Sequence, residues 1–332
     1  MNYQKYYVKE VKEKSSEKLF NVISCFAGGG GSSTGYRLAG ANILLINEFV
    51  EEAISTYKAN FPDTKVLVDD IKKYSSDDFL EMAGIKVGEL DLLDGSPPCS
   101  AFSLSGKRNK GWVGYVEDTT QSEIDFETGE VIQTGEKKIK EGIKKYSTKV
   151  QEGIEDLFLE YIRIAKGIQP KVIVAENVKG ITFGESKKKL LEFINDFERI
   201  GYEVSYQVLN AADFGTPQAR ERTIFICVRK DVASKIGLNF MNINGIFPSK
   251  TVSKHVSMKE AFEDIENDPE EVKMLLDYVE GSFQKKFLSF LPFNPEKPLK
   301  PSDKQFHEFN PKGSCFNMIR PAPNLPSPTL TQ

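Results

Sequence analysis

Short apolar runs alternate with amphipathic stretches along most of the chain. The apolar runs predict seven β-strands and the amphipathic stretches predict helices between them. The predicted strands are Leu19–Phe26, Ile43–Asn47, Lys65–Val68, Leu90–Asp94, Val172–Ala175, Glu203–Leu209 and Thr223–Val228. The predicted helices are Thr34–Ala39, Val50–Asn60, Ser76–Met82, Ile154–Gly167 and Lys188–Ile200. This alternation predicts an α/β fold of right-handed βαβ units, with a mostly parallel sheet that carries helices on both faces.

Three segments depart from this rhythm. Residues 1–18 are polar and charged, and we expect a loose N-terminal lead-in. Residues 115–149 form a polar insertion inside a domain that spans residues 19–229, and the sequence around Thr128-Gly129 is typical of a hairpin. Residues 230–332 are rich in loops and prolines, which predicts a separate and smaller region. Within that region, the sequence predicts a helix near Asp268–Glu280.

Composition narrows the possible classes of protein. Of 332 residues, 39% are hydrophobic and 28% are charged, which is typical of a soluble globular chain. The net charge of −4 disfavours nucleic-acid binding over the whole protein surface but permits binding in a local basic cleft. We find neither an apolar run of membrane-spanning length nor a signal-peptide core, so we expect a cytoplasmic protein without a membrane partner. The four cysteines are widely spaced, which disfavours a disulfide framework or a zinc site.

A glycine-rich turn follows the first predicted strand, in the sequence Phe26-Ala27-Gly28-Gly29-Gly30-Gly31. Glu48 lies about twenty positions further on, where a carboxylate can bind ribose hydroxyls. Asp70 ends the third strand and can hold an adenine edge, and Phe26 can pack on the adenine face. Because the regular GxGxxG spacing is absent, these residues favour a cofactor without phosphates, such as S-adenosylmethionine, over NAD. Glycines and surface acids without a ligand are the alternative.

The sequence Pro97-Pro98-Cys99 leaves the fourth predicted strand. Two prolines make a stiff, non-helical exit from the strand, which places Cys99 at the sheet edge where open α/β sheets bind ligands. A thiol at that edge suits a nucleophile. A free cysteine is also often a small buried core residue, and this motif alone does not decide between the two interpretations.

Two further motifs carry charge at strand ends. Glu176 follows the apolar strand Val172–Ala175, and a carboxylate there is costly to bury unless it is paired. Arg220 and Arg222 are two residues apart on a strand, so they point to the same side. They can neutralise Glu176 or bind an anionic or carbonyl partner. The alternative is a salt-bridge ladder on the surface.

Taken in order, the motifs FAGGGG, NE, DI, GSPPCSAFSLSGKR, ENVKG and QARER resemble those of the cytosine-C5 DNA methyltransferases. The resemblance runs from about Leu19 to Arg229. It implies a Rossmann-like class I methyltransferase sheet in a catalytic domain of residues 19–229, and a partial target-recognition region in residues 230–332. It also implies S-adenosylmethionine as the cofactor, double-stranded DNA as the partner and a restriction–modification setting.

The resemblance implies roles for individual residues. Cys99 would attack C6 of a cytosine flipped out of the duplex, and C5 would then take the methyl group. Glu176 would hydrogen-bond the N3 edge, Arg222 would contact O2 and orient Glu176, and Arg220 would support them. The positions that match cofactor contacts or the proline before the nucleophile are Phe26, Gly28, Gly30, Glu48, Phe49, Asp70, Ile71 and Pro98.

The resemblance has a limit at the C-terminus. Arg320 to Gln332 resembles the stretch that precedes the last two motifs of the family, and neither motif follows. We therefore expect an incomplete chain that binds cofactor weakly and methylates poorly, and a second polypeptide is one way to complete it.

Two other functions stay open. One is a transfer-RNA cytosine methyltransferase, although the Cys-Phe-Thr segment typical of those enzymes is absent. The other is an inactive subunit that acts as a DNA-binding partner.

Overall fold

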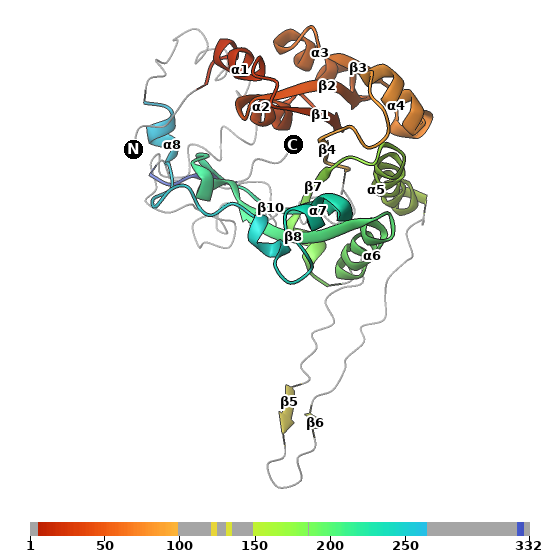
Figure 1. The fold of residues 1–332 in the computed structure, drawn as a ribbon. Helices are drawn as coiled ribbons and strands as arrows, with labels where there is room; N and C mark the ends of the chain where they lie inside the picture. Colours follow the sequence, from red (N-terminus) through yellow and green to blue (C-terminus); the bar gives the residue numbers. More distant parts are fainter. Residues whose placement is uncertain are drawn as a thin grey trace.

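The structure is a computed structural model that describes residues 6–98, 121–124, 131–134, 149–184, 186–263 and 324–328 (Figure 1). Its centre is a seven-stranded sheet of order β3-β2-β1-β4-β7-β10-β8. The strands are β1 Phe20–Cys25, β2 Ala41–Glu48, β3 Lys65–Val68, β4 Leu92–Gly95, β7 Val172–Val178, β8 Tyr202–Asn210 and β10 Glu221–Arg229. Each of the seven predicted strands is confirmed within a few residues.

The sheet is mostly parallel, as predicted. β1 pairs in parallel with β2 and β4, β2 with β3, and β4 with β7. β10 runs antiparallel to both of its neighbours, β7 and β8. The sheet order reverses direction around β1, and an order that reverses leaves a crevice at the carboxyl ends of the central strands.

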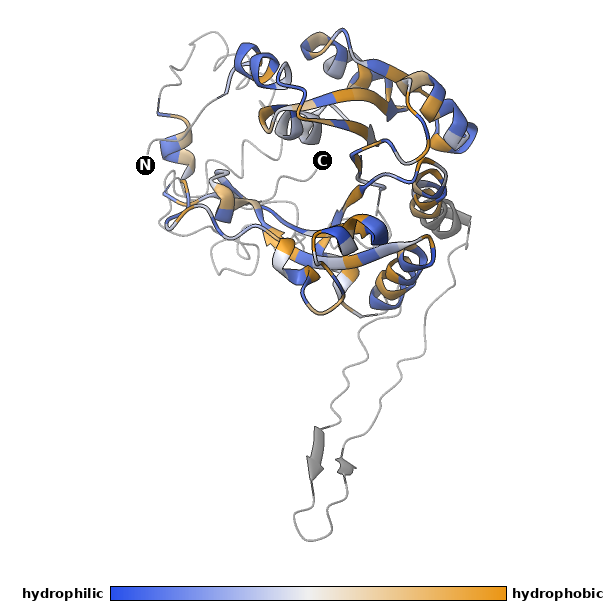
Figure 2. Cartoon of the chain, in the orientation of Figure 1, coloured by the Kyte–Doolittle hydropathy of each residue, from blue (hydrophilic) through white to orange (hydrophobic). Residues whose placement is uncertain are grey.

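The five helices predicted between Thr34 and Ile200 are also confirmed. They are α2 Gly31–Leu38, α3 Glu51–Asn60, α4 Ser76–Ala83, α5 Lys149–Ile168 and α6 Ser186–Arg199. Successive residues of β1 face opposite sides of the sheet and belong to different cores. Ile23 packs with buried residues of α4, α5 and α6, whereas Val22 packs with Tyr57 and Phe61 near the end of α3. Figure 2 shows the result as apolar strands between helices with polar outer faces.

The N-terminal segment is ordered rather than loose. Val8–Ser15 forms helix α1, and Val11 is only 3% exposed in the core that contains Val22. Ser15 Oγ donates to the carbonyl of Ala41 at 2.6 Å and accepts a hydrogen bond from Arg37 at 3.1 Å. Val11 is the one buried apolar residue among the lysines and glutamates of this helix, and so short a pattern is weakly amphipathic, which explains why the sequence does not predict the helix.

Shorter elements complete the described chain. They are η1 Ile71–Lys73, η2 Lys179–Thr182, η3 Ala211–Phe214, β9 Gln218–Ala219, α7 Lys230–Lys235, η4 Ile243–Ile246, α8 Met258–Ala261 and β11 Ser327–Pro328. β5 Gln121–Ile124 pairs antiparallel with β6 Val131–Thr134, which confirms the predicted hairpin strands. The predicted helix at Asp268–Glu280 lies outside the described residues. None of the helices in the described ranges is long and apolar enough to span a membrane.

Candidate active site

Strand register places the ends of the strands that carry or lead to several predicted site residues along one edge of the sheet. Cys25 pairs with Asn47 on one side and with Gly95 on the other, and Gly95 pairs with Ala175. The next residue of each strand continues this row toward the carboxyl edge, in the order Glu48, Phe26, Ser96 and Glu176. Adjacent strands lie about 4.8 Å apart. The structure therefore confirms that β4, which leads to Cys99, and β7, which carries Glu176, end at the same edge.

The glycine-rich turn contains backbone that strongly favours glycine. Gly28 has φ of +55° and Gly30 has φ of +95°. A Cβ atom on Gly28 would meet nothing within 4 Å, whereas a Cβ atom on Gly30 would lie 2.9 Å from the ring of Tyr57. Gly28 thus borders open space in which a ligand can approach the backbone. Gly30 is needed for packing against Tyr57 and for the start of α2.

Glu48 is a buried carboxylate that closes the turn from the neighbouring strand. Its Oε2 accepts from the amide of Gly28 at 2.8 Å, and its Oε1 accepts from the amides of Phe49 and Val50 at 2.8 and 2.9 Å. A carboxylate oxygen has two lone pairs, so Oε2 can accept a further hydroxyl. The ring of Phe49 is 59% exposed beside it. An exposed aromatic ring, a carboxylate and an open glycine backbone fit the adenosine part of S-adenosylmethionine.

Asp70 and Ile71 follow β3 at the same edge. Asp70 Oδ1 accepts from the amide of Lys72 at 3.0 Å and caps η1. Ile71 is 1% exposed and belongs to the core, so its side chain packs inside the domain. Phe26 has φ of +55°, and its ring centroid lies 6.5 Å from that of Tyr161.

Glu176 and Arg222 form an ion pair at the end of β7. Arg222 Nε lies 2.7 Å from Glu176 Oε1, and the side chains are 20% and 32% exposed, respectively. Burial raises the pKa of Glu176 above its ordinary value, although Arg222 and Arg220 both act to lower that pKa. The pKa of Arg220 is lowered by burial and by the charge of Arg222. The structure thus brings these three predicted residues together around one carboxyl group that is easier to protonate than usual.

Asn210 holds the arginine segment in place, although the sequence analysis did not single it out. Its Oδ1 accepts from the amides of Ala212 and Arg220, both at 3.1 Å. The amide of Ala211 also donates to the carbonyl of Arg220 at 3.0 Å. An asparagine at a strand end that bonds the backbone two residues on is a known turn device, and this pattern was the available signal.

The segment that leads to Cys99 is described as far as Pro98. Pro97 is buried and Pro98 is exposed, and Ser96 Oγ donates to the carbonyl of Phe26 at 3.2 Å. Cys99 itself lies outside the described residues, so its role stays a prediction. The two cysteines that are described, Cys25 and Cys227, are fully buried, and burial raises the pKa of both thiols. Neither is suited to act as a thiolate nucleophile.

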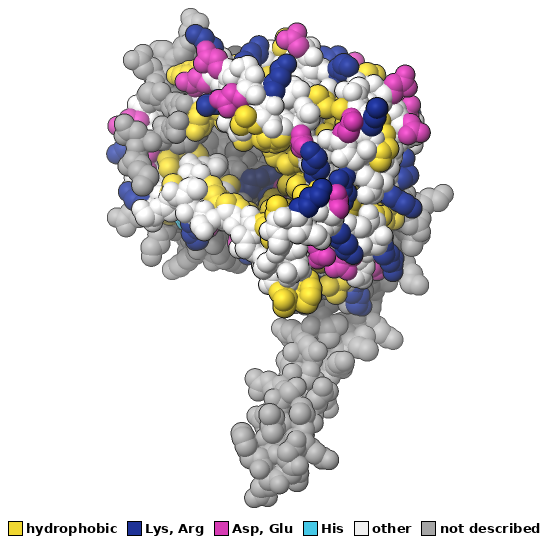
Figure 3. Space-filling model, in the orientation of Figure 1, with side chains coloured by type: hydrophobic (Ala, Val, Ile, Leu, Met, Phe, Trp, Pro, Cys, Tyr) yellow, Lys and Arg dark blue, Asp and Glu magenta, His cyan; other side chains and the backbone are white. Residues whose placement is uncertain are grey.

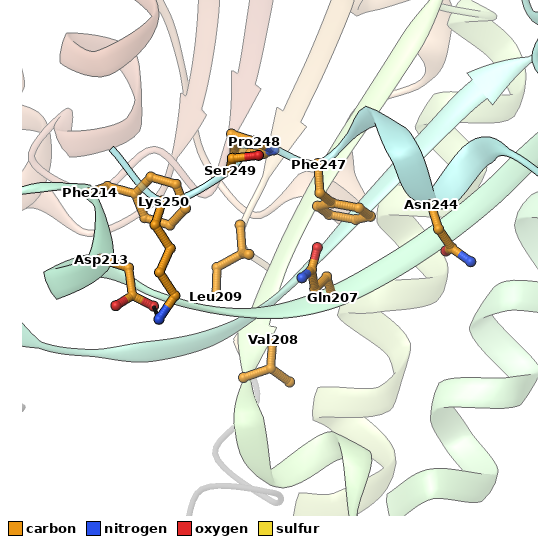
Figure 4. A pocket seen from close by; sticks show the side chains of 10 residues that line it. All are labelled: Gln207, Val208, Leu209, Asp213, Phe214, Asn244, Phe247, Pro248, Ser249 and Lys250. Carbon is orange, nitrogen blue, oxygen red and sulfur yellow. Dashed lines mark ion pairs between the residues drawn. The ribbon is translucent and has the colours of Figure 1, made fainter. Parts of the chain in front are cut away.

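The described surface has a central hollow, and a pocket lies beside β8. Figure 3 shows a hollow near the centre of the molecule, with Lys and Arg side chains inside it. A pocket of about 600 Å³ lies beside β8, η3 and η4 (Figure 4). In that pocket, Asp213 is paired with Lys250 at 3.0 Å and with His255 at 2.8 Å. Its charge is therefore neutralised, and we assign the pocket no function.

The fold and the site together define the class of protein. A mostly parallel seven-stranded sheet, reversed at β10 and carrying a glycine-rich turn after β1, is a Rossmann-like class I methyltransferase fold. The sequence profile of the C-5 cytosine-specific DNA methylase family matches residues 20–119 and 142–310. The chain belongs to this family.

Similar proteins agree with this assignment. Type II methyltransferase M1.HphI of Haemophilus parahaemolyticus is 35% identical over 209 residues, which cover 63% of this chain and 45% of the relative. Type II methyltransferase M.AquIA of a Picosynechococcus species is 33% identical over 243 residues, which cover 69% of this chain and 76% of the relative. The crystal structure of a candidate DNA modification methyltransferase from an E. coli prophage has a TM-score of 0.53 at 21% identity, covering 75% of this chain and 56% of that one. The chain spans about half the length of most of the curated relatives it matches.

Proposed function

We propose that this protein transfers a methyl group from S-adenosylmethionine to C5 of cytosine in double-stranded DNA, with the target base flipped out of the duplex. The observation that carries the proposal is the Glu176–Arg222 ion pair, which lies on the sheet edge shared with Glu48 and with the start of the Cys99 loop. Family membership supports the same reaction.

The residues around Glu176 suit the electronic demand of this reaction. Cytosine C6 is a weak electrophile until N3 receives a proton or a strong hydrogen bond. Burial raises the pKa of Glu176, so this carboxyl group can share a proton with N3. Arg222 fixes the carboxyl group at 2.7 Å and balances its charge when it ionises. The proposed role of Arg220 is to support this arrangement from the adjoining position.

In the proposed reaction, Cys99 Sγ forms a bond to C6, which makes C5 nucleophilic. S-adenosylmethionine, when bound, supplies an electrophilic methyl group. Transfer of the methyl group to C5 would release S-adenosylhomocysteine. C5 then loses its proton to solvent, the bond between Sγ and C6 breaks with its electrons returning to sulfur, and Cys99 is regenerated as a thiolate. The residues that would hold the cofactor are Gly28, Glu48, Phe49 and Asp70, with Phe26 and Pro98 at the border of the site.

The proposed function also includes the substrate of the protein, its biological setting and its domains. Double-stranded DNA is the proposed substrate, and the related proteins named Type II methyltransferases favour a restriction–modification setting in the cytoplasm. We propose residues 19–229 as the catalytic domain and residues 230–332 as part of a target-recognition region. The second polypeptide stays a prediction.

Methyl transfer under enzyme excess tests the proposal. The purified chain is incubated with methyl-labelled S-adenosylmethionine and unmethylated genomic DNA, which contains every short target sequence, and the DNA is digested to nucleosides. Transfer RNA is offered in a parallel reaction. We expect label in 5-methylcytosine from DNA, retained by Cys315→Ser and lost in Cys99→Ser. Label only in the transfer RNA, or no label although the cofactor binds, contradicts the proposal.

A further inference from the structure

Asp94 is a buried carboxylate that the proposed reaction does not use. It lies near the end of β4 and is 7% exposed. Its Oδ2 accepts from Ser24 Oγ and Ser32 Oγ, both at 2.7 Å, and its Oδ1 accepts from the hydroxyl of Tyr36 at 3.0 Å. Three hydroxyl groups thus donate hydrogen bonds to this one buried carboxylate. Such bonds are needed, because a buried charge is tolerated only when it is hydrogen-bonded.

The three donors come from both sides of the glycine-rich turn. Ser24 lies on β1, before the turn, whereas Ser32 and Tyr36 lie on α2, after it. The carboxylate therefore clamps the two ends of the turn onto β4. A fourth hydrogen bond runs in the opposite direction, because Ser96 Oγ, just beyond β4, donates to the carbonyl of Phe26 inside the turn at 3.2 Å.

We propose that Asp94 is a positioning residue that couples the glycine-rich turn to the loop leading to Cys99. The inference rests on the proposed function, in which the turn binds the cofactor and the loop carries the nucleophile. Any shift of the turn on cofactor binding either moves the end of β4 with it or breaks hydrogen bonds to Asp94. Cofactor occupancy and the environment of the Cys99 thiol are thereby linked.

Asp91 provides a matched control on the same segment. It lies three residues before Asp94, at the opposite end of β4, where it accepts from the amide of Asn21 at 2.8 Å and from Lys171 Nζ at 2.7 Å. Asp91→Asn thus changes a hydrogen-bonded carboxylate that touches neither the turn nor the loop. Asp94→Asn keeps the shape and can still bond to the hydroxyls, which both donate and accept. Asp94→Ala removes the network.

The experiment measures two quantities in the full chain carrying Cys315→Ser. The first is the affinity for S-adenosylhomocysteine by calorimetry, and the second is the rate of Cys99 alkylation by iodoacetamide with and without S-adenosylhomocysteine. Cys25 and Cys227 are buried and Cys315 is replaced, so the measured alkylation is assigned to Cys99. Before each measurement, circular dichroism confirms that the variant is folded. Ser32→Ala, which removes one donor, replaces Asp94→Ala if that variant does not fold.

The proposal predicts that saturating S-adenosylhomocysteine changes the alkylation rate about fivefold or more in the unsubstituted background. Asp94→Ala binds S-adenosylhomocysteine about tenfold more weakly and abolishes the change in alkylation rate. Asp94→Asn and Asp91→Asn retain the change. The coupling is overturned if S-adenosylhomocysteine binds the background chain without changing the alkylation rate of Cys99. It is also overturned if S-adenosylhomocysteine changes that rate in Asp94→Ala as much as it does in the background chain. A background chain that does not bind S-adenosylhomocysteine contradicts the proposed function instead.

Discussion

Arg222 Nε lies 2.7 Å from Oε1 of Glu176, and this ion pair joins the antiparallel strands β10 and β7 at the edge where β4 also ends. In register, Arg222 faces Val178 and Ile224 faces Glu176. The arginine thus reaches back along the strand to the carboxylate. The pair combines a charge partner with partial burial, which is the environment that tunes a carboxyl group for proton sharing.

Replacing Glu176 by glutamine tests its proposed role in sharing a proton with N3 of the cytosine. Glu176→Gln keeps the size of the side chain and removes the proton-sharing group, so we expect methyl transfer to fall about 10²–10⁴-fold. The affinity for S-adenosylhomocysteine should stay within about twofold, because Glu176 lies three strands from Glu48. Single-turnover transfer and calorimetry measure the two effects. An equal loss of cofactor affinity would show that Glu176 is a structural residue.

Replacing Arg222 tests the direction of the pKa shift. Burial raises the pKa of Glu176 and Arg222 opposes that rise, so Arg222→Ala should raise this pKa further. If transfer needs protonated Glu176, activity falls as pH rises through its pKa, and this limb should move to higher pH in the variant while the maximum rate drops. The pH profile of single-turnover transfer measures the limb. A shift to lower pH would contradict the assignment.

Gly95 should tolerate no side chain. A Cβ atom there would clash with Cε2 of Tyr161, whose hydroxyl donates to the carbonyl of Leu93 at 3.0 Å. We expect Gly95→Ala to lower the free energy of unfolding by about 1–3 kcal/mol in urea titrations. Gly35→Ala is the control, because nothing lies within 4 Å of its Cβ position in α2, and it should stabilise the chain by about 0.5–1 kcal/mol. Equal effects of the two substitutions would contradict the close packing.

Helix α1 should contribute to the stability of the whole domain. Val11 is 3% exposed and packs in the core beside β1, whereas Val8 of the same helix is 42% exposed. Val11→Ala should cost about 2 kcal/mol of the free energy of unfolding, and Val8→Ala should change it by less than about 0.5 kcal/mol. Chemical denaturation of the two variants makes the comparison. If Val11→Ala left the free energy of unfolding unchanged, the N-terminal segment would be loosely attached, and this account of α1 would be wrong.

Asp94 should make stability depend on pH. Burial outweighs its three hydrogen bonds and raises its pKa above 3.8, so its contribution to stability is present at low pH and is lost as pH rises through the folded-state pKa. The stability of Asp94→Asn relative to the unsubstituted chain should therefore increase from about pH 4 to about pH 7. Thermal unfolding at the two pH values measures this difference. A difference that shrinks with pH would reverse the sign of the shift.

The sequence predicts what depends on local pattern. Periodicity locates the strands, and the residues at the strand ends, such as Glu48 and Glu176, follow from it. Asp94 could not be recognised in this way, because its partners come from segments that only the folded sheet brings together. Asn210 has a local signal in its bond to the amide of Ala212, but its bond to the amide of Arg220 depends on the fold. The raised pKa of Glu176 likewise depends on burial, which strand pairing decides. Helix α1 is held by a single buried valine and a serine, too few positions for a periodic signal.

Trapping the bond between the protein and its target base tests the central claim most directly. The chain is incubated with S-adenosylmethionine and with duplex copies of unmethylated genomic DNA in which 5-fluorocytosine replaces cytosine. Fluorine at C5 cannot leave as a proton does, so the bond between sulfur and C6 should persist through denaturation. We predict a denaturant-resistant adduct that forms only with the cofactor, maps by mass spectrometry to the peptide containing Cys99 and is absent in Cys99→Ser. An adduct that persists in Cys99→Ser, or no adduct although cofactor and DNA bind, would contradict the account.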